Sequence, residues 1–282
     1  MLKYLIVNAD DLGISPGVSS GILHAHKMGI VTSTTAMVNT AFFRESIQTA
    51  MTESVGIGLH ITLSYGAPVL PASEVPSLVD KQGNFLSFPI VAPFNAQELQ
   101  SEIEAQFSLF TEVAGCLPDH IDSHQFMANV HPAAFKTVLN LAKDHQIPIR
   151  NPHMFLSKNK LHQFMRSRKT NPLAELDGRI EELQQIYAHF CVAHPDFFEY
   201  RFFDTGVTVD NLLEILRNLP TGVTEIMCHP GYSYDLQNDY YLEKRDQEVE
   251  VLTNERILQA IQDEGIQLVT FGQIESIHGS KI

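Results

Sequence analysis

The chain has 282 residues, and its 33 acidic and 19 basic side chains leave a formal net charge of −14 at pH 7. This balance argues against nucleic acid or an anionic membrane surface as the main partner, because both attract clustered Lys and Arg. With 44% hydrophobic residues, no secretory signal and no run of the roughly 18 apolar residues that span a membrane, the sequence predicts a cytoplasmic globular protein without an integral membrane segment.

Apolar, β-branched runs alternate with helical segments along the chain, a pattern typical of βα units around a parallel sheet. The eight predicted strands are Tyr4–Ala9, Thr34–Asn39, Gly56–Thr62, His120–Asp122, Pro148–Asn151, Phe198–Phe203, Thr224–Cys228 and Gln267–Phe271. Eight strands with helices between them indicate a barrel. Since no linker, repeat or charge block marks a boundary, we expect residues 1–282 to form a single domain.

Apolar periodicity predicts helices whose stripes face the core. The two clearest stripes are Leu99, Ile103, Phe107 and Phe110, and Leu176, Ile180, Leu183, Ile186 and Phe190. Leu252, Leu258 and Ile261 indicate a third, less regularly spaced helix.

Two stretches interrupt the alternation of strands and helices. Residues Ser64 to Asn95 are rich in proline and have no regular period, which predicts a long loop insertion at about 64–95. The apolar content of this loop favours self-association, so a homodimer is an expected state. Residues Ser157 to Thr170 are basic and polar and are also expected to be irregular.

Polar residues stand at the carboxyl ends of five predicted strands. These segments are Asn8-Ala9-Asp10-Asp11, Gly58-Leu59-His60, Asp122-Ser123-His124, Arg150-Asn151 and Cys228-His229-Pro230-Gly231. In a parallel barrel all these ends lie on one face, where active sites are built. Residues as distant as Asp10 and His229 are therefore expected to converge.

Asp11, His60 and His124 make a set of one carboxylate and two imidazoles that suits a divalent cation with open positions for water and substrate. Successive strand residues face opposite sides, so Asp10 and Asp11 can act together only if the backbone turns, and Gly13 permits a turn. Asp10 is then the candidate general base, since a carboxylate beside a cation stays ionised. A bound cation lowers the pKa of water towards about 7 and polarises a carbonyl, which favours amide or ester hydrolysis.

Amide hydrolysis also requires an acid that protonates the departing amine. His229 is the best candidate, because histidine titrates near neutrality. Arg150 joins the catalytic set as a residue that can position Asp10 or bind substrate, and Asp246 is a candidate for orienting His229. The donor set suits zinc, manganese, iron or nickel, and with several waters magnesium; magnesium or zinc is expected.

Four motifs span most of the chain: Val7-Asn8-Ala9-Asp10-Asp11-Leu12-Gly13, Gly58-Leu59-His60-Ile61-Thr62-Leu63, Ile121-Asp122-Ser123-His124 and Met227-Cys228-His229-Pro230-Gly231. Together they resemble the YdjC-like carbohydrate deacetylase family. The resemblance implies an α/β fold of the distorted TIM-like (β/α) barrel type and a metal-dependent hydrolase that removes N-acetyl groups from sugars, notably chitooligosaccharides. It also implies that Asp11, His60 and His124 are metal ligands, that Asp10 is the base and that His229 is the acid.

The loop segment between Pro68 and Phe85 is similar to that of the family's hopanoid-biosynthesis-associated branch, which acts on an N-acetylglucosamine attached to a hopanoid lipid. Many relatives continue the Asp-Ser-His motif with further histidines, whereas this chain has Gln125 and Phe126. The expected ligand His124 is retained, so the departure concerns substrate contacts.

Two other functions stay open at this point. A glycosidase acting on a small, possibly phosphorylated disaccharide usually needs two carboxylates that flank the bond, whereas Asp10 and Asp11 are sequence neighbours. A non-catalytic sugar-binding barrel would need neither the base Asp10 nor the acid His229. The sequence therefore favours the deacetylase, with an N-acetylated saccharide as its partner.

Overall fold

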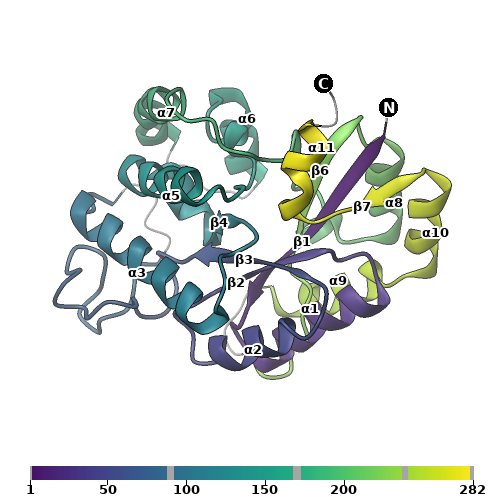
Figure 1. Cartoon of the computed structure of the whole chain (residues 1–282), viewed down its shortest axis with the longest axis horizontal. Coiled ribbons are helices and arrows are strands. Elements are labelled where there is room, and N and C mark those ends of the chain that lie inside the picture. Colours follow the sequence, from purple (N-terminus) through teal and green to yellow (C-terminus); the bar gives the residue numbers. More distant parts are fainter. Residues whose placement is uncertain (1, 88–91, 168–172, 237–240, 280–282) are drawn as a thin grey trace. The chain divides into compact units, whose positions relative to one another are not determined.

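The computed structural model describes residues 2–87, 92–167, 173–236 and 241–279 (Figure 1). The strands among these residues are β1 (Lys3–Leu12), β2 (Ser33–Ala36), β3 (Gly56–Ile61), β4 (Ile121–Ser123), β5 (Phe197–Glu199), β6 (Gly222–Cys228) and β7 (Ile266–Leu268). In the described part of the chain they form one sheet in the order β4-β3-β2-β1-β6-β5, and β7 pairs with β1. The predicted α/β fold of the distorted TIM-like type is confirmed.

The chain forms two compact units, which are described separately. Unit 1 comprises residues 1–37, 41–58 and 194–282, and unit 2 comprises residues 38–40 and 59–193. The strand β3 begins in unit 1 and ends in unit 2.

Strand β1 is the centre of unit 1, and every residue from Leu5 to Leu12 is buried. It pairs in parallel with β6 from Lys3 to Ala9. Because a strand has two edges, the other edge is shared: β7 pairs with its first residues and β2 with its last. A run buried on both faces is typical of a parallel sheet covered by helices.

The helices of unit 1 are α1 (Pro16–Met28), α2 (Phe43–Ala50), α8 (Val209–Arg217), α9 (Leu242–Leu252), α10 (Glu255–Asp263) and α11 (Ile274–Gly279), with 3₁₀ turns at Asp204–Gly206 and Phe271–Gln273.

Helix α1 holds the segment that follows β6. Ser15 caps the helix by accepting a hydrogen bond from the Val18 backbone N–H, and Pro16 occupies the first turn. The Asp235 carboxylate accepts hydrogen bonds from the Ser15 hydroxyl and the Gly17 backbone N–H, both at 2.7 Å. An anionic side chain at a helix N-terminus is stabilising, so Asp235 fastens this segment to α1.

Unit 2 contains the pair β3 and β4, which are parallel from Leu59 opposite Ile121 to Ile61 opposite Ser123. Its helices are α3 (Ala96–Ala114), α4 (Met127–Val130), α5 (Pro132–His145), α6 (Lys158–Ser167) and α7 (Leu173–Tyr187), with 3₁₀ turns at His124–Phe126 and Pro152–Met154. The predicted apolar stripe of α3 is buried, which confirms its core position. No helix in the described ranges combines the length and apolarity needed to cross a membrane.

The predicted long loop lies between β3 and α3. Outside residues 88–91, which lie beyond the described residues, its regular structure is a single bridge between Val79 and Phe85. Buried Glu102 on α3 accepts hydrogen bonds from the backbone N–H groups of Val69 and Leu70, at 2.9 and 3.0 Å. Burial raises the pKa of Glu102, while these hydrogen bonds lower it. The first part of the loop is therefore held by hydrogen bonds to a side chain of α3, and not by strand pairing.

Three sequence expectations differ from the structure. The fifth expected strand, Pro148–Asn151, is reduced to one bridge between Ile149 and Ile121, because prolines stand at both ends of this short segment and offer no N–H. The third expected helix is two helices, α9 and α10, since Asn254 caps α10 anew. The expectation of irregular structure at Ser157–Thr170 is wrong for α6, in which basic and polar residues outnumber the apolar ones and hide the helical period; residues 168–170 lie outside the described residues.

Gly21 on α1 allows the backbone after β6 to approach closely. A Cβ atom there would lie 2.5 Å from the Cα of Gly231 and 2.7 Å from the backbone N of Tyr232. We expect Gly21→Ala to lower the free energy of unfolding by about 1–3 kcal/mol, because backbone rather than a flexible side chain must move. Urea unfolding measures this change. Gly178→Ala on α7 is the control: nothing lies within 4 Å of its added Cβ, so equal destabilisation by the two variants would contradict the explanation.

Candidate active site

Most of the predicted site residues lie at the carboxyl ends of strands, in both units, and Arg150 follows the isolated bridge at Ile149. Unit 1 carries Asp10 and Asp11 on β1 and His229 directly after β6. Unit 2 carries His60 on β3, His124 after β4, and Arg150.

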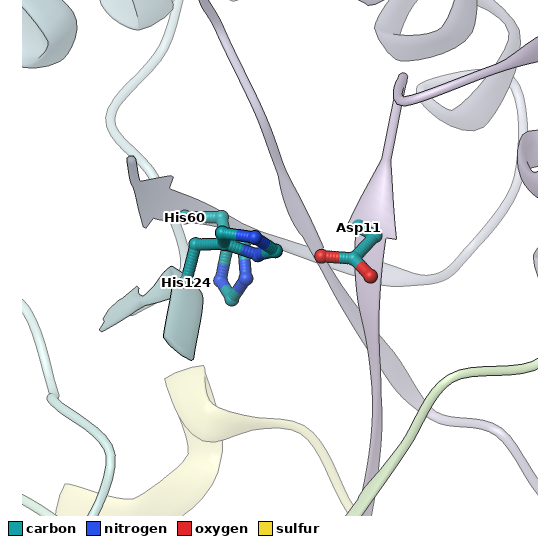
Figure 2. Close-up of side chains that lie close together, drawn as sticks. All are labelled: Asp11, His60 and His124. Carbon is teal, nitrogen blue, oxygen red and sulfur yellow. The ribbon is translucent and has the colours of Figure 1, made fainter. Parts of the chain in front are cut away.

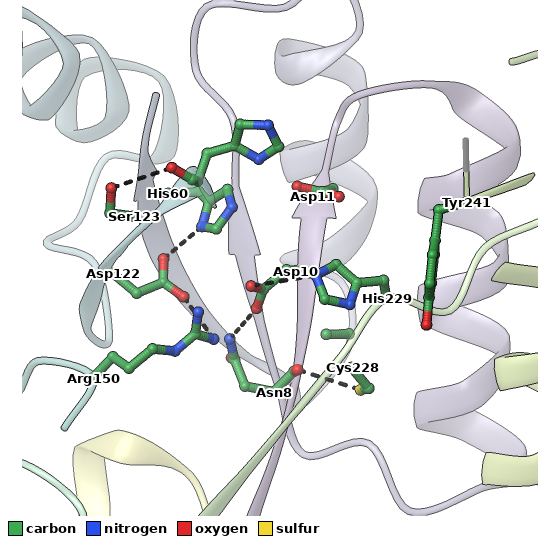
Figure 3. Close-up of polar contacts among 12 residues, drawn as sticks. Asn8, Asp10, Asp11, His60, Asp122, Ser123, Arg150, Cys228, His229 and Tyr241 are labelled. Atoms are coloured by element: carbon green, nitrogen blue, oxygen red, sulfur yellow. Dashed lines mark hydrogen bonds and ion pairs between the residues drawn. The ribbon is translucent and has the colours of Figure 1, made fainter. Parts of the chain in front are cut away.

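A bulge in β1 sets the directions of Asp10 and Asp11. Ala9 is opposite Thr34 and Leu12 is opposite Ala36, so three residue steps on β1 match two on β2. Asp11 has a φ of +74°, in the left-handed region that non-glycine residues seldom adopt. The turn that the sequence requires is present, but it lies at Asp11 itself rather than only at Gly13. Figure 3 shows both carboxylates at the end of β1.

Asp10 lies between an amide and an imidazole. Asn8 Nδ2 donates a hydrogen bond of 2.9 Å to Asp10 Oδ1, and His229 Nε2 lies 3.9 Å from Asp10 Oδ2 (Figure 3). The Asp10 side chain is buried and that of His229 is partly buried. The predicted base and the predicted acid of unit 1 are thus neighbours.

Asp11 has a cationic partner that the sequence analysis missed. Arg245 Nη2 donates a hydrogen bond of 2.8 Å to Asp11 Oδ2, and both side chains are buried. A charge-assisted pair of this kind orients the carboxylate and compensates its negative charge.

The His229 ring is bordered by two aromatic side chains. Phe203 and Tyr241 stack on each other with centroids 4.6 Å apart, and the His229 ring meets each of them edge-on at 5.5 and 5.6 Å. Glu248 on α9 accepts hydrogen bonds from the His229 backbone N–H and, at 2.6 Å, from the Tyr241 hydroxyl. Burial raises the pKa of Glu248 to about 8, although these hydrogen bonds lower it.

Asp246 does not take the place that the sequence analysis suggested for it. Its carboxylate accepts a 3.3 Å hydrogen bond from the Ser233 backbone N–H. Glu248, two residues later on the same helix, is the residue of α9 whose carboxylate accepts the hydrogen bond from the His229 backbone N–H.

In unit 2, Asp122 orients His60. Asp122 Oδ1 lies 2.7 Å from His60 Nδ1, and Asp122 Oδ2 lies 3.0 Å from Arg150 Nη2 (Figure 3). Burial raises the pKa of the Asp122 carboxyl, but Arg150 and His60 outweigh this effect and hold it well below its usual range. Because a carboxylate only accepts, His60 Nδ1 carries a proton and Nε2 is the ring atom suited to a cation.

His124 lies beside His60, with ring centroids 5.3 Å apart at an interplanar angle of 74° (Figure 2). The two residues after it, Gln125 and Phe126, both have left-handed backbones. Gln125 Oε1 accepts a hydrogen bond of 2.9 Å from the Ser64 hydroxyl, and Phe126 is buried. Gln125 and Phe126 therefore shape a tight turn, and Gln125 joins it to the long loop.

His120 is a fully buried imidazole that also borders Asp122. Its Nδ1 lies 3.4 Å from Asp119 Oδ1, and its Nε2 lies 3.8 Å from Asp122 Oδ2. Burial alone lowers the pKa of His120, but the two carboxylates outweigh it and raise the pKa to about 9. The sequence alone does not predict this raised pKa, because it depends on how close the Asp119 and Asp122 carboxylates lie to the His120 ring in the fold.

We expect His120 to make stability depend on pH. Its folded pKa of about 9 exceeds the unfolded value, so its stabilisation is complete below about pH 6.5 and is lost as pH rises through 9. By linkage the loss reaches about 3 kcal/mol. Urea unfolding at pH 6 and pH 9 should show a smaller pH difference for His120→Gln than for the wild type. The same pH difference in both proteins would contradict a charged His120.

This chain is similar to known proteins in sequence and in structure. The family model described as YdjC-like protein matches residues 4–263. A carbohydrate deacetylase of Enterococcus faecalis is 35% identical over 279 residues, covering 95% of this chain and 97% of its own. A chitooligosaccharide deacetylase of Proteus mirabilis is 32% identical, covering 96% and 98%.

A solved structure is similar over the same extent. It comes from Enterococcus faecalis V583, carries the provisional description of a cellobiose-phosphate cleavage protein, and aligns with a TM-score of 0.78 at 33% identity, covering 96% of this chain and 98% of its own. The resemblance read from the four motifs is confirmed, and this chain belongs to the YdjC-like family.

Proposed function

We propose that this protein is a metal-dependent hydrolase that removes N-acetyl groups from a sugar. The observation that carries the proposal is the pairing of Asp10 and His229, because a buried carboxylate and an imidazole 3.9 Å apart supply the base and the acid of amide hydrolysis. The relatives named carbohydrate deacetylase and chitooligosaccharide deacetylase match nearly the full chain and support the same reaction.

Asp11, His60 and His124 are the residues proposed to hold a divalent cation. Each offers one ligand atom, and within unit 2 the His60 and His124 rings lie with their centroids 5.3 Å apart, which supports the assignment of these two imidazoles as a pair (Figure 2). Two imidazole nitrogens and a carboxylate oxygen suit zinc better than magnesium, which prefers oxygen ligands. The hydrogen bond that His60 Nδ1 donates to the Asp122 carboxylate is the kind of contact that orients a ligating histidine. When bound, the cation would lower the pKa of a water molecule and polarise the acetyl carbonyl.

The chain's own side chains would move the protons. Asp10 accepts a proton from the attacking water, with its orientation set by Asn8. His229 Nε2 donates a proton to the departing amine nitrogen as the C–N bond breaks, so acetate and a free amine are the products. Arg150 would act indirectly, because its ion pair fixes the Asp122 carboxylate that accepts the hydrogen bond from His60.

Two classes of N-acetylated saccharide are proposed as substrate. Chitooligosaccharides agree with the name of the Proteus mirabilis relative. An N-acetylglucosaminyl lipid agrees with the resemblance of the segment between Pro68 and Phe85 to the hopanoid-associated branch. The same chemistry at the acetamide serves both.

The description of the Enterococcus faecalis V583 structure favours a second candidate, cleavage of a glycosidic bond in a phosphorylated disaccharide. Such cleavage usually uses two carboxylates on opposite sides of the bond. Asp10 and Asp11 come from the same strand end, and Asp11 is paired with Arg245, so the arrangement favours deacetylation.

We expect the metal-loaded protein to release acetate from N-acetylglucosamine oligomers without a rise in reducing ends. His60→Ala and His124→Ala should lose the bound metal and the acetate signal together, whereas His189→Ala, at an exposed position, should keep both. Free acetate and reducing ends are measured in the same reaction. Reducing ends without acetate would instead identify a glycosidase, and full acetate release by His60→Ala would refute the proposed site.

Asp10→Asn separates the base from the ligands. It should lower kcat by about 10²- to 10⁴-fold, because the amide cannot accept the proton, while the metal bound per chain stays unchanged. Metal analysis by atomic emission, beside the rate of acetate release, checks both parts. Loss of the metal in this variant would make Asp10 a ligand and overturn the division of roles.

A further inference from the structure

We propose that helix α9 holds the proposed acid in place, with Glu248 and Tyr241 as positioning residues for the His229 imidazole. The inference rests on the proposed function, because it assigns how one of its groups is held. All the contacts that carry it lie within unit 1.

The first observation is that side chains of α9 bind the backbone of His229 from both directions. Glu248 accepts a hydrogen bond from the His229 backbone N–H, and Arg245 Nη1 donates to the His229 carbonyl at 3.5 Å. The Arg245 carbonyl also accepts a hydrogen bond from the Gly231 backbone N–H. The residue directly after β6 is thereby attached to a helix that begins 13 residues later.

The second observation concerns the ring. Tyr241 donates its hydroxyl proton to Glu248 at 2.6 Å and accepts a hydrogen bond from the Asp204 backbone N–H at 3.0 Å. Its ring stacks on Phe203, and both rings meet His229 edge-on. Both carboxylate oxygens of Glu248 thus serve His229, one at its backbone and the other through the aromatic ring beside its imidazole.

The third observation is that one face of α9 contacts both the proposed metal ligand and the proposed acid of unit 1. Arg245 and Glu248 are three residues apart, so they lie on the same face of α9, and both are buried. Arg245 binds the carboxylate of Asp11 while Glu248 binds His229. A polar or charged group is costly to bury without partners, so these two side chains are stable there only with the partners they have.

The test compares Glu248→Gln and Tyr241→Phe with Glu250→Gln, the same kind of substitution at an exposed position of α9. On N-acetylglucosamine oligomers, the first two variants should lower kcat by about 10- to 100-fold, because an acid is worth roughly 10²- to 10⁴-fold and is here displaced rather than removed. KM and bound metal should stay near the wild-type values. Glu250→Gln should match the wild type.

A second substrate separates positioning from general damage. The leaving group of 4-nitrophenyl acetate needs no proton, so Glu248→Gln and Tyr241→Phe should hydrolyse it at close to the wild-type rate. Adding Glu248→Gln to His229→Ala should cause no further loss with the amide substrate, since residues that act as a unit are not additive.

The outcomes distinguish this inference from the proposed function. If the wild type releases no acetate from the oligomers, the proposed function is wrong. If the wild type is active and both variants keep wild-type kcat, or lose activity equally on the amide and on the ester, the positioning role is wrong. Additive losses in the double variant would also overturn it.

Discussion

The bulge in β1 is the constraint on which the rest of the site in unit 1 depends. In a regular strand, Asp10 and Asp11 would face opposite sides of the sheet. The extra residue step against β2 and the left-handed backbone of Asp11 remove that alternation. The two neighbouring carboxylates then receive different surroundings. Asp10 accepts from Asn8 beside the His229 imidazole, and Asp11 accepts from the Arg245 guanidinium.

Buried ion pairs and hydrogen bonds support the chemistry in each unit. In unit 2 the Asp122 carboxylate lies between His60 and Arg150, and in unit 1 the Glu248 carboxylate joins the His229 backbone to the Tyr241 hydroxyl. A polar or charged group buried without such partners is destabilising, so these groups are stable only as sets. The side chains proposed to act on the substrate are consequently positioned by other residues, such as Asp122 and Glu248, that would not contact the substrate themselves.

Most of the fold could be predicted from periodicity. Seven of the eight expected strands overlap strands of the described chain, and the buried stripe of α3 is where its spacing puts it. The failures have local causes: prolines bracket the segment around Ile149, and α6 has only three apolar residues among seven basic and polar ones. Helix α9 was indistinct for a different reason. Its buried face includes Arg245 and Glu248, so hydrophobicity does not mark which side packs inward.

The sequence by itself determined the class of fold, the family and the types of chemical group at the strand ends, because these follow from short motifs and from the rule that parallel strands end on one face. Only the tertiary structure decided which partner holds each group. Arg245 lies 234 residues from Asp11, and Asp122 lies 62 residues from His60. No local pattern links such residues, since their pairing depends on which buried charges the packed chain brings together. The sequence could suggest Asp246 beside His229, but the helical turn of α9 presents Glu248 instead.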